Sequence, residues 1–143
     1  MSYLRKGAIK FVLDSRLENV WMVGVAVKSY CLESGFSQDA SASVEVALVE
    51  AVNNTIIHAY HSQAGHPVEI RVILEPERIV FHIEDQGDGF SPRPRSETVI
   101  DPSDITSLPE GGYGLMLIHG IMDQVEYQST GKNNLLIMSK WFA

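Results

Sequence analysis

A long helical pattern from about residue 40 to residue 62 is the feature that most constrains the fold. At roughly 100° per residue, apolar side chains cover most of its circumference, and helices of this kind are normally buried. The pattern nevertheless carries the carboxylate Glu50 and, one turn later, the carboxamide Asn54, with Asn53 beside it. Burying such groups without partners is costly. They therefore either end a helix with their hydrogen bonds satisfied or face a ligand.

The other periodic segments predict an α+β fold. The expected elements in chain order are a strand at 6–13, a helix at 16–34, the helix at 40–62, strands at 68–74 and 78–85, a loop at 86–112, a helix at 112–122, and strands at 125–129 and 135–142. Strands that pair as hairpins imply a two-layer α/β sandwich, with a mixed, mainly antiparallel sheet and helices on one face. A Rossmann sheet would instead alternate strands and helices.

The apolar positions of the 16–34 helix predict a broad stripe that faces the core. These positions are Leu17, Val20, Trp21, Val25, Val27 and Cys31. We expect Gly35 to end this helix.

Composition limits the class of protein. A chain of 143 residues, of which 45% are hydrophobic, suits a single domain spanning residues 1–143. The formal charge of −7 argues against nucleic acid as the main partner. The single Cys31 allows neither an internal disulfide nor a paired-cysteine metal site. The start of the chain has no long apolar run, so we expect a cytoplasmic protein without a membrane span.

Two glycine-rich motifs flank the expected loop. Asp85-Gln-Gly-Asp-Gly-Phe ends a strand, and Gly111-Gly-Tyr-Gly-Leu precedes a helix. Glycines before a helix N-terminus let backbone N–H groups approach a phosphate, and a strand-ending Asp can accept from an amino group such as that of adenine. Both motifs also have an ordinary explanation, because Asp and Gly are common in turns. No P-loop motif is present.

The loop at 86–112 is long for a compact domain, and such loops usually carry function. We expect a lid with one short helix near Ser103. Arg93 and Arg95 in this loop are either solvated charges or phosphate contacts. His61, His66, His82 and His119 have no metal-ligand spacing and are expected to be surface or core residues.

The polar groups make chemical sense as one set. An Asn oxygen is a suitable ligand for Mg²⁺, which prefers a few protein oxygens together with phosphate and water. A neighbouring Glu can take a proton from a hydroxyl nucleophile. Base, metal ligand, adenine acceptor and phosphate loop would together bind and use a nucleotide.

Three boxes in this order resemble the N, G1 and G2 boxes of the Bergerat ATP-binding fold, which is shared by gyrase, histidine kinases and mismatch-repair ATPases. They are Glu50…Asn54…His58-Ala-Tyr, Asp85-x-Gly-x-Gly-Phe and Gly112-x-Gly-Leu-x-Leu-Ile. Within that group, VEAVNNTIIHAY, DQGDGF, GGYGLMLIHGIMDQVEYQ and GKNNLLIMSKWF are similar to segments of the bacterial anti-sigma-factor serine/threonine kinases. The resemblance covers residues 11–142.

The resemblance implies ATP and Mg²⁺ as cofactors. It makes Glu50 the catalytic base, Asn54 the Mg²⁺ ligand, and Asp85 the acceptor for the adenine amino group. The other nucleotide-binding positions that it implies are His58, Gly87, Gly89, Gly112, Tyr113, Gly114, Leu115 and Asn134. The chain departs from the usual pattern of the family at Asn53, Ala59 and Tyr113.

The implied activity is that of an ATP-dependent serine/threonine protein kinase acting as an anti-sigma regulatory factor. Its expected partners are an anti-sigma-factor antagonist of the STAS type, which it phosphorylates on Ser or Thr, and a sigma factor or other regulatory target. A homodimer through the N-terminal strand and helix is also implied. Asn53 and Tyr113 leave open a nucleotide-gated anti-sigma binding module with weak or no kinase activity. An isolated histidine-kinase catalytic domain is disfavoured, because no phosphoacceptor helical domain fits in this length.

Overall fold

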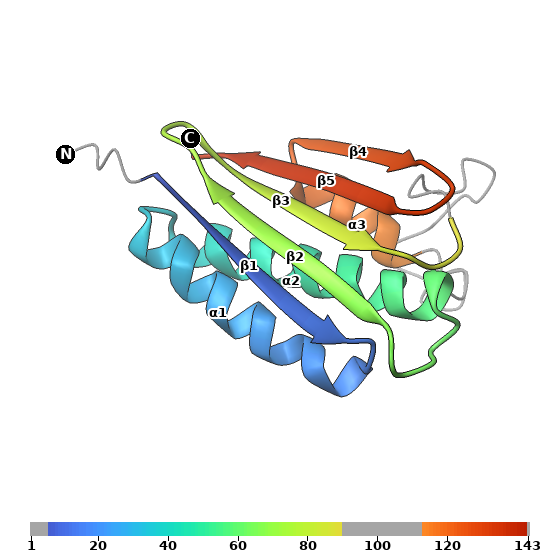
Figure 1. Cartoon of the computed structure of the whole chain (residues 1–143). Helices are drawn as coiled ribbons and strands as arrows, with labels where there is room; N and C mark the ends of the chain where they lie inside the picture. The colour runs from blue at the N-terminus through green and yellow to red at the C-terminus, as the bar shows by residue number, and fades with distance from the viewer. Residues whose placement is uncertain (1–5, 90–112, 143) are drawn as a thin grey trace.

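The computed structural model describes residues 6–89 and 113–142 (Figure 1). The described elements are β1 (Gly7–Asp14), a 3₁₀ turn (Leu17–Asn19), α1 (Val20–Glu33), α2 (Gln38–Asn54), a π-helical turn (Thr55–Ala59), β2 (Pro67–Leu74), β3 (Arg78–Asp85), α3 (Tyr113–Ile121), β4 (Gln124–Ser129) and β5 (Asn134–Trp141). The bounds predicted for the strands agree with these to within one residue.

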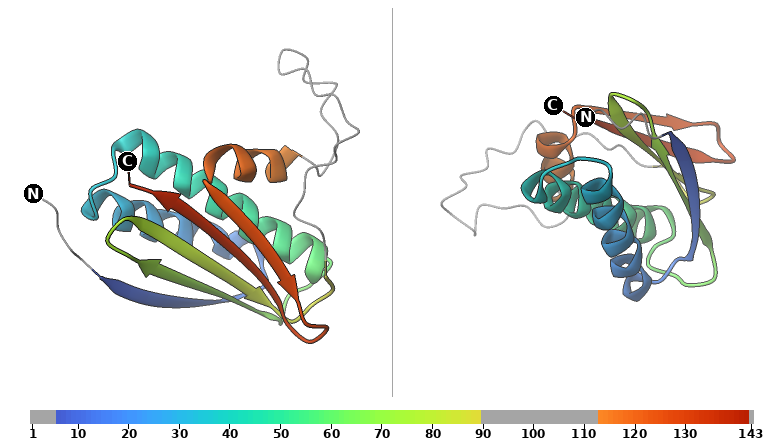
Figure 2. Two further views of the ribbon diagram at one scale, coloured as in Figure 1. Left: turned by 90° about the horizontal axis from the view of Figure 1, so that it is seen from above. Right: turned by 90° about the vertical axis from the view of Figure 1, so that its left-hand side faces the viewer.

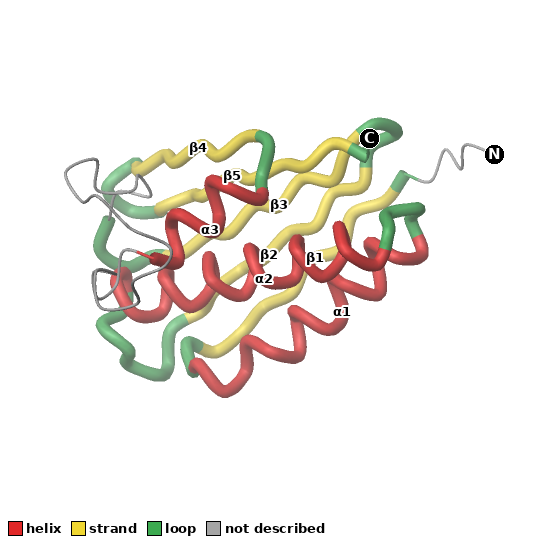
Figure 3. The backbone as a smooth tube through the Cα atoms, turned by 180° about the vertical axis from the view of Figure 1, so that it is seen from behind, coloured by secondary structure: helices red, strands yellow, loops and turns green. Residues whose placement is uncertain are grey.

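The described strands form a sheet in the order β1-β2-β3-β5-β4, and every neighbouring pair is antiparallel. The tube view shows the three helices gathered on one face of this sheet (Figure 3). The predicted α+β two-layer sandwich is therefore confirmed, and among the described strands no pair is parallel.

The middle of the helical layer is α2, which lies between α1 and α3 (Figure 2). Its central position explains why most of its circumference is apolar: the side chains of Val44, Leu48 and Val52 are fully buried. On the sheet side, β2 alternates in the expected way, with Val68, Ile70 and similar residues turned to the helices. The core therefore lies between α2 and the strands β2, β3 and β5.

The stripe predicted for α1 is only partly buried. Val20, Val27 and Cys31 are buried as expected, but Leu17, Trp21 and Val25 are exposed. The prediction that all of them face the core is wrong. α1 lies at the edge of the helical layer (Figure 2). Among the described elements, it packs on the sheet and on α2, which leaves these side chains exposed.

Local signals set the helix ends. Gly35 adopts a φ of +108° just after α1, a conformation that favours glycine. The Oγ of Ser37 accepts a hydrogen bond from the N–H of Ala40 at 3.1 Å and so caps α2. The predicted 40–62 helix is α-helical only to Asn54 and then widens into the π turn, a feature that is frequent at functional sites.

Most of the predicted lid lies outside the described residues. Phe90 to Gly112, including Arg93, Arg95 and the expected helix near Ser103, belong to that part of the chain. None of the helices within the described ranges is long and apolar enough to cross a membrane.

Candidate functional site

The end of α2 meets the beginning of α3, and this contact brings two of the predicted boxes together. A Cβ placed on Gly114 would lie 2.5 Å from Oε2 of Glu50 and 3.4 Å from Nδ2 of Asn54. Gly114 therefore leaves the space that the Glu50 carboxylate occupies. Any larger residue at this position would push against the carboxylate and the neighbouring amide.

Asn54 is buried but incompletely bonded. The residue is 8% exposed, and its Nδ2 has no hydrogen-bond partner among the described atoms. A buried amide left without a partner costs free energy, typically about 1–3 kcal/mol. The oxygen and nitrogen of an amide are told apart by their surroundings. In either orientation, one polar atom of this side chain remains free to form a hydrogen bond with a ligand.

Glu50, Asn54 and Gly114 form one cluster of site residues. Asp85, at the C-terminal end of β3, is the centre of a second cluster. It is 3% exposed, and the register of β3 and β5 places Asn134 directly opposite. Its Oδ1 accepts from Nδ2 of Asn134 at 2.8 Å and from the N–H of Gly87 at 2.9 Å. Both of these hydrogen bonds end on Oδ1, and within the described part of the chain no hydrogen bond to Oδ2 accompanies them.

Asn134 holds this cluster in place. Its Nδ2 also donates to the carbonyl of Gly87 at 2.9 Å, and its Oδ1 accepts from Oγ of Ser129 at 2.7 Å. Gly89 lies beside the same atoms, since a Cβ there would be 3.4 Å from both Oδ1 of Asn134 and Oγ of Ser129. Asp85 is therefore fixed by a network that spans β3, β4 and β5.

Burial raises the pKa of Asp85 above its ordinary value, and the hydrogen bonds from Asn134 and Gly87 lower it in part. Desolvation makes the ionised carboxyl costly in the absence of a ligand. An additional donor at Oδ2 would offset this cost.

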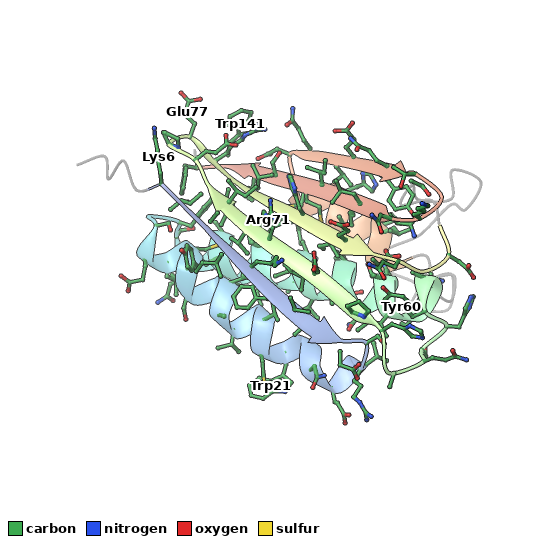
Figure 4. The ribbon with its side chains drawn as sticks, viewed as in Figure 1. Lys6, Trp21, Tyr60, Arg71, Glu77 and Trp141 are labelled. Carbon is green, nitrogen blue, oxygen red and sulfur yellow. The ribbon has the colours of Figure 1, made fainter. Side chains whose placement is uncertain are left out.

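The π turn connects the two clusters. The N–H of Asp88 donates to the carbonyl of Ala59 at 2.9 Å, and Gly87 packs so closely on that carbonyl that no Cβ would fit. The hydroxyl of Tyr60 donates to the carbonyl of Pro67 at 2.6 Å and accepts from the N–H of Gln86 at 2.8 Å. Figure 4 labels Tyr60 at this end of the sheet. The end of α2 is thus tied to the loop that follows β3.

Of the other residues predicted to bind the nucleotide, some are described by the structure and some are not. His58 is exposed on the π turn, and Leu115 is half-buried against the core in α3. Gly112 and the side chain of Tyr113 lie outside the described part of the chain. Ser129 and Tyr60 were not predicted as site residues from the sequence. Tyr60 stands inside the quoted N box, whereas no sequence signal pointed to Ser129.

The described residues offer little to a metal ion on their own. Among them, no group of three or more His, Cys, Asp or Glu side chains is placed to hold a metal. The atom of Asn54 without a partner among the described residues is Nδ2, which can donate a hydrogen bond to a phosphate oxygen. An amide ligates Mg²⁺ only through its oxygen, so Asn54 fits this metal only if phosphate and water supply most of the other ligands. The residues present therefore fit a metal that arrives with a nucleotide.

The fold and the site together define a class of protein. An antiparallel sheet covered on one face by helices carries an acid and an amide of α2 against the first turn of α3, with a buried Asp at the end of the central strand. This is the architecture of the Bergerat ATP-binding domain.

The sequence matches the model of the histidine kinase-like ATPase domain over residues 13–140. The chain belongs to this family. It is 31% identical over 124 residues to the anti-sigma F factor of Oceanobacillus iheyensis, covering 85% of this chain and 82% of that protein. It is 28% identical over 124 residues to the serine-protein kinase RsbW of Bacillus velezensis, covering 85% and 78%.

A solved structure shares the fold. The crystal structure of the RsbU and RsbW domains of Rv1364c from Mycobacterium tuberculosis aligns with a TM-score of 0.65 at 12% identity. The alignment covers 94% of this chain and 32% of that longer chain. The histidine kinase AdeS of Acinetobacter baumannii aligns with a TM-score of 0.51 at 17% identity.

Proposed function

We propose that this protein is an ATP-dependent serine/threonine protein kinase that acts as an anti-sigma regulatory factor. Membership of the histidine kinase-like ATPase family and relatives named serine-protein kinase and anti-sigma F factor support this proposal. The observation that carries it is the position of the Glu50 carboxylate, directly against Gly114 and next to the incompletely bonded Asn54. A carboxylate there can act on a hydroxyl presented to the nucleotide phosphates.

In this proposal the buried clusters hold the two ends of ATP. Oδ2 of Asp85 would accept the adenine amino group, while Gly87, Gly89 and Asn134 shape the pocket around it. The amide oxygen of Asn54 would serve as one ligand of Mg²⁺. The glycines at 112 and 114, with Tyr113, Leu115 and His58, line the phosphate side. Bound ATP and Mg²⁺ supply the γ-phosphoryl group and neutralise part of its charge.

Glu50 acts as the general base. It takes the proton of a Ser or Thr hydroxyl while that oxygen bonds to the γ-phosphorus and the bond from phosphorus to the leaving ADP oxygen breaks. Most of the rate enhancement comes from positioning and from charge neutralisation, as is usual for phosphoryl transfer. The protein contributes a carboxylate whose place is set by the packing of α2 on α3.

The proposed partners follow from the names of the relatives. The protein would bind a sigma factor or another regulatory target, and it would phosphorylate a STAS-type antagonist that competes for it. A homodimer through β1 and α1 belongs to the same proposal. A binding module without phosphate transfer is the competing possibility, but relatives named as kinases favour the enzyme.

The substitution Glu50→Gln tests the catalytic assignment. Removing a general base typically lowers the rate of transfer by about 10²–10⁴-fold, and ATP binding should be retained because Gln keeps the size of the side chain. Transfer is measured with labelled ATP and purified candidate antagonist domains, and binding by calorimetry.

Glu126→Gln serves as the control, because Glu126 lies on β4 at the other face of the sheet. Equal rates for the wild type and Glu50→Gln would refute the base assignment. Tight binding of ATP and Mg²⁺ with no transfer to any candidate would instead favour the binding module.

A further inference from the structure

A groove runs between α1 and α2 on the outside of the helical layer. It has a cavity volume of about 440 Å³, and it is lined by residues of α2 on one side and of α1 and the 3₁₀ turn before it on the other. These residues are Leu17, Val20, Trp21 and Val25 on one side and Glu45, Val46, Val49, Glu50 and Asn53 on the other. The two helices run antiparallel, so the start of α1 lies beside the end of α2 (Figure 1).

The walls of the groove are apolar and exposed. Trp21 is 63% exposed, Val25 51% and Val46 42%. Figure 4 shows the side chain of Trp21 projecting from α1 toward solvent. Exposed apolar residues that gather in one place usually mark an interaction site, whereas singly scattered ones do not.

Gly24 lies at the contact between α1 and α2, against two of the residues that line the groove. A Cβ at this position would lie 2.8 Å from Cγ2 of Val49 and 3.4 Å from Cγ of Glu45. Gly24 therefore lets α1 approach α2 closely and allows the Glu45 side chain to lie across it. The shape of the groove therefore depends on the close packing of α1 against α2.

The groove is also acidic. Glu45 and Glu50 line it, about 7.5 Å apart along the axis of α2, and none of the described lining residues is Lys, Arg or His. An occupant that combined apolar side chains with a cation would match both the walls and the charge.

The groove is continuous with the candidate site. Glu50 lines it and at the same time lies against Gly114. α1 and α3 flank α2 on opposite sides (Figure 2). The groove therefore reaches the Glu50 carboxylate from the α1 side, while Gly114 and Asn54 lie on the α3 side. A hydroxyl that approached along the groove would arrive opposite the proposed nucleotide.

We infer that this groove docks the protein substrate through a segment that carries apolar side chains and at least one Lys or Arg next to the phosphorylated Ser or Thr. The inference rests on the proposed kinase function and adds the chemistry of the substrate to it. Trp21 and its apolar neighbours hold the segment, Glu45 pairs with its cation, and the hydroxyl reaches Glu50.

Binding is tested separately from catalysis, with three synthetic peptides that carry a central Ser flanked by Leu and Arg, by Leu and Glu, or by Gly and Arg. The protein carries Trp141→Phe, so that Trp21 is its single remaining tryptophan. Titration without ATP should change the Trp21 fluorescence with the Leu–Arg peptide. The other two peptides should bind at least about tenfold more weakly, and high salt should weaken the Leu–Arg complex.

Two variants should each weaken the Leu–Arg complex at least about tenfold: Glu45→Lys, followed by fluorescence, and Trp21→Ala, followed by calorimetry. Met22→Ala is the matched control, since Met22 is 48% exposed on the same helix but does not line the groove. Equal binding of all three peptides, or no effect of Glu45→Lys, would overturn the inference.

Two further outcomes separate this inference from the function on which it rests. Peptide binding with these preferences but without phosphate transfer to any substrate would keep the docking surface and overturn the kinase activity. The homodimer proposed above through β1 and α1 must leave this groove open. Sedimentation that shows a dimer converted to monomer by Trp21→Glu would mean that a second copy of the chain covers the groove, and would overturn its assignment to the substrate.

Discussion

At the scale of single residues, the site contains polar groups held in costly surroundings. Asp85 is buried with a raised pKa, and the amide of Asn54 is buried with unused bonding capacity. Neither condition favours the ligand-free protein. Both would be relieved by a ligand that brings a hydrogen-bond donor to Asp85 and an acceptor, such as a phosphate oxygen, to Nδ2 of Asn54. Stability and binding should therefore respond in opposite directions to substitution.

The substitution Asp85→Asn should separate these effects. The raised pKa means that the folded state holds the proton of Asp85 more tightly than the unfolded chain, whose value is near 3.8. The free energy of unfolding therefore falls as pH rises through that value toward the folded pKa, and the burial cost persists at neutral pH. Replacing the carboxylate by a neutral amide should make the ligand-free variant more stable than the wild type, by an amount that grows as pH rises through this interval and is constant above it.

The same substitution should weaken ATP binding. Oδ1 of the amide can still accept from Asn134 and Gly87, which turns its NH₂ group toward the adenine amino group, so that donor faces donor. Loss of a charge-assisted hydrogen bond, worth about 1.5–3 kcal/mol, lowers affinity roughly ten- to a hundredfold. Urea unfolding across pH and calorimetry with ATP measure the two effects. A variant that is less stable than the wild type at every pH would contradict the first expectation.

At the scale of elements, the position of Glu50 depends on how α3 begins. α3 contains two described glycines with different surroundings. A Cβ at Gly114 would lie 2.5 Å from Oε2 of Glu50, whereas nothing lies within 4 Å of a Cβ at Gly120. Gly in a helix is less favourable than Ala by about 0.5–1 kcal/mol. Substitution by Ala should therefore stabilise the helix by a similar amount at both positions. Only the substitution at Gly114 should also disturb the site.

Gly114→Ala should lower phosphate transfer at least about tenfold, because the new methyl group displaces the Glu50 carboxylate and small errors of position slow catalysis strongly. Gly120→Ala should leave transfer unchanged and raise the free energy of unfolding by up to about 1 kcal/mol. Single-turnover rates and denaturant unfolding provide the measurements. Equal transfer by the two variants would mean that the packing of α3 on Glu50 has no part in the reaction.

The elements themselves could be predicted from sequence because their signals are local. The alternation of residues in β3 and the glycine at Gly35, which was expected to end the first long helix, lie within a few residues of the features they specify. The π turn could not be predicted in this way, since an apolar pattern with a period of 3.6 residues continues through Thr55–Ala59. Its wider turn accompanies backbone contact with the segment around Gly87, which is distant in the chain.

The site residues divide in the same way, into those with a local sequence signal and those whose role depends on contacts between distant parts of the chain. Glu50, Asn54 and Asp85 stand out because polar groups are unusual where the pattern demands burial. The bond from Asn134 to Asp85 joins residues 49 positions apart and depends on the register of β3 with β5. Trp21 was expected in the core because its spacing is helical, but periodicity does not reveal that α1 lies at the edge of its layer.

At the scale of the whole molecule, the candidate site and the end of α1 lie at opposite ends of the helical layer. Cys31 lies roughly 16 Å along α1 from Val20, whose turn borders the groove next to Glu50. Cys31 is fully buried in the same core cluster as Leu48, Val52 and Ile56 of α2 and the π turn. If the helices and the sheet unfold as one cooperative unit, a ligand at one end must protect a group at the other.

Cys31 provides the probe for this cooperativity. Burial raises the pKa of its thiol to about 12, and since only the thiolate is a good nucleophile, the folded protein should react very slowly with a thiol reagent at neutral pH. Labelling should then require unfolding, and its rate should follow the population of the unfolded state. The sequence contains one cysteine, so the labelled fraction reports on this position alone.

Saturating ATP and Mg²⁺ should slow this labelling. A ligand present at a hundred times its Kd stabilises the folded state by about 2.7 kcal/mol, which lowers the unfolded population roughly a hundredfold. Asp85→Asn should lose much of the protection because it binds ATP more weakly, whereas Met22→Ala should keep it. Protection is measured as the labelling rate with and without nucleotide. If saturating nucleotide leaves the rate unchanged, Cys31 is reached by local opening of α1, and the two ends of the helical layer do not unfold as one unit.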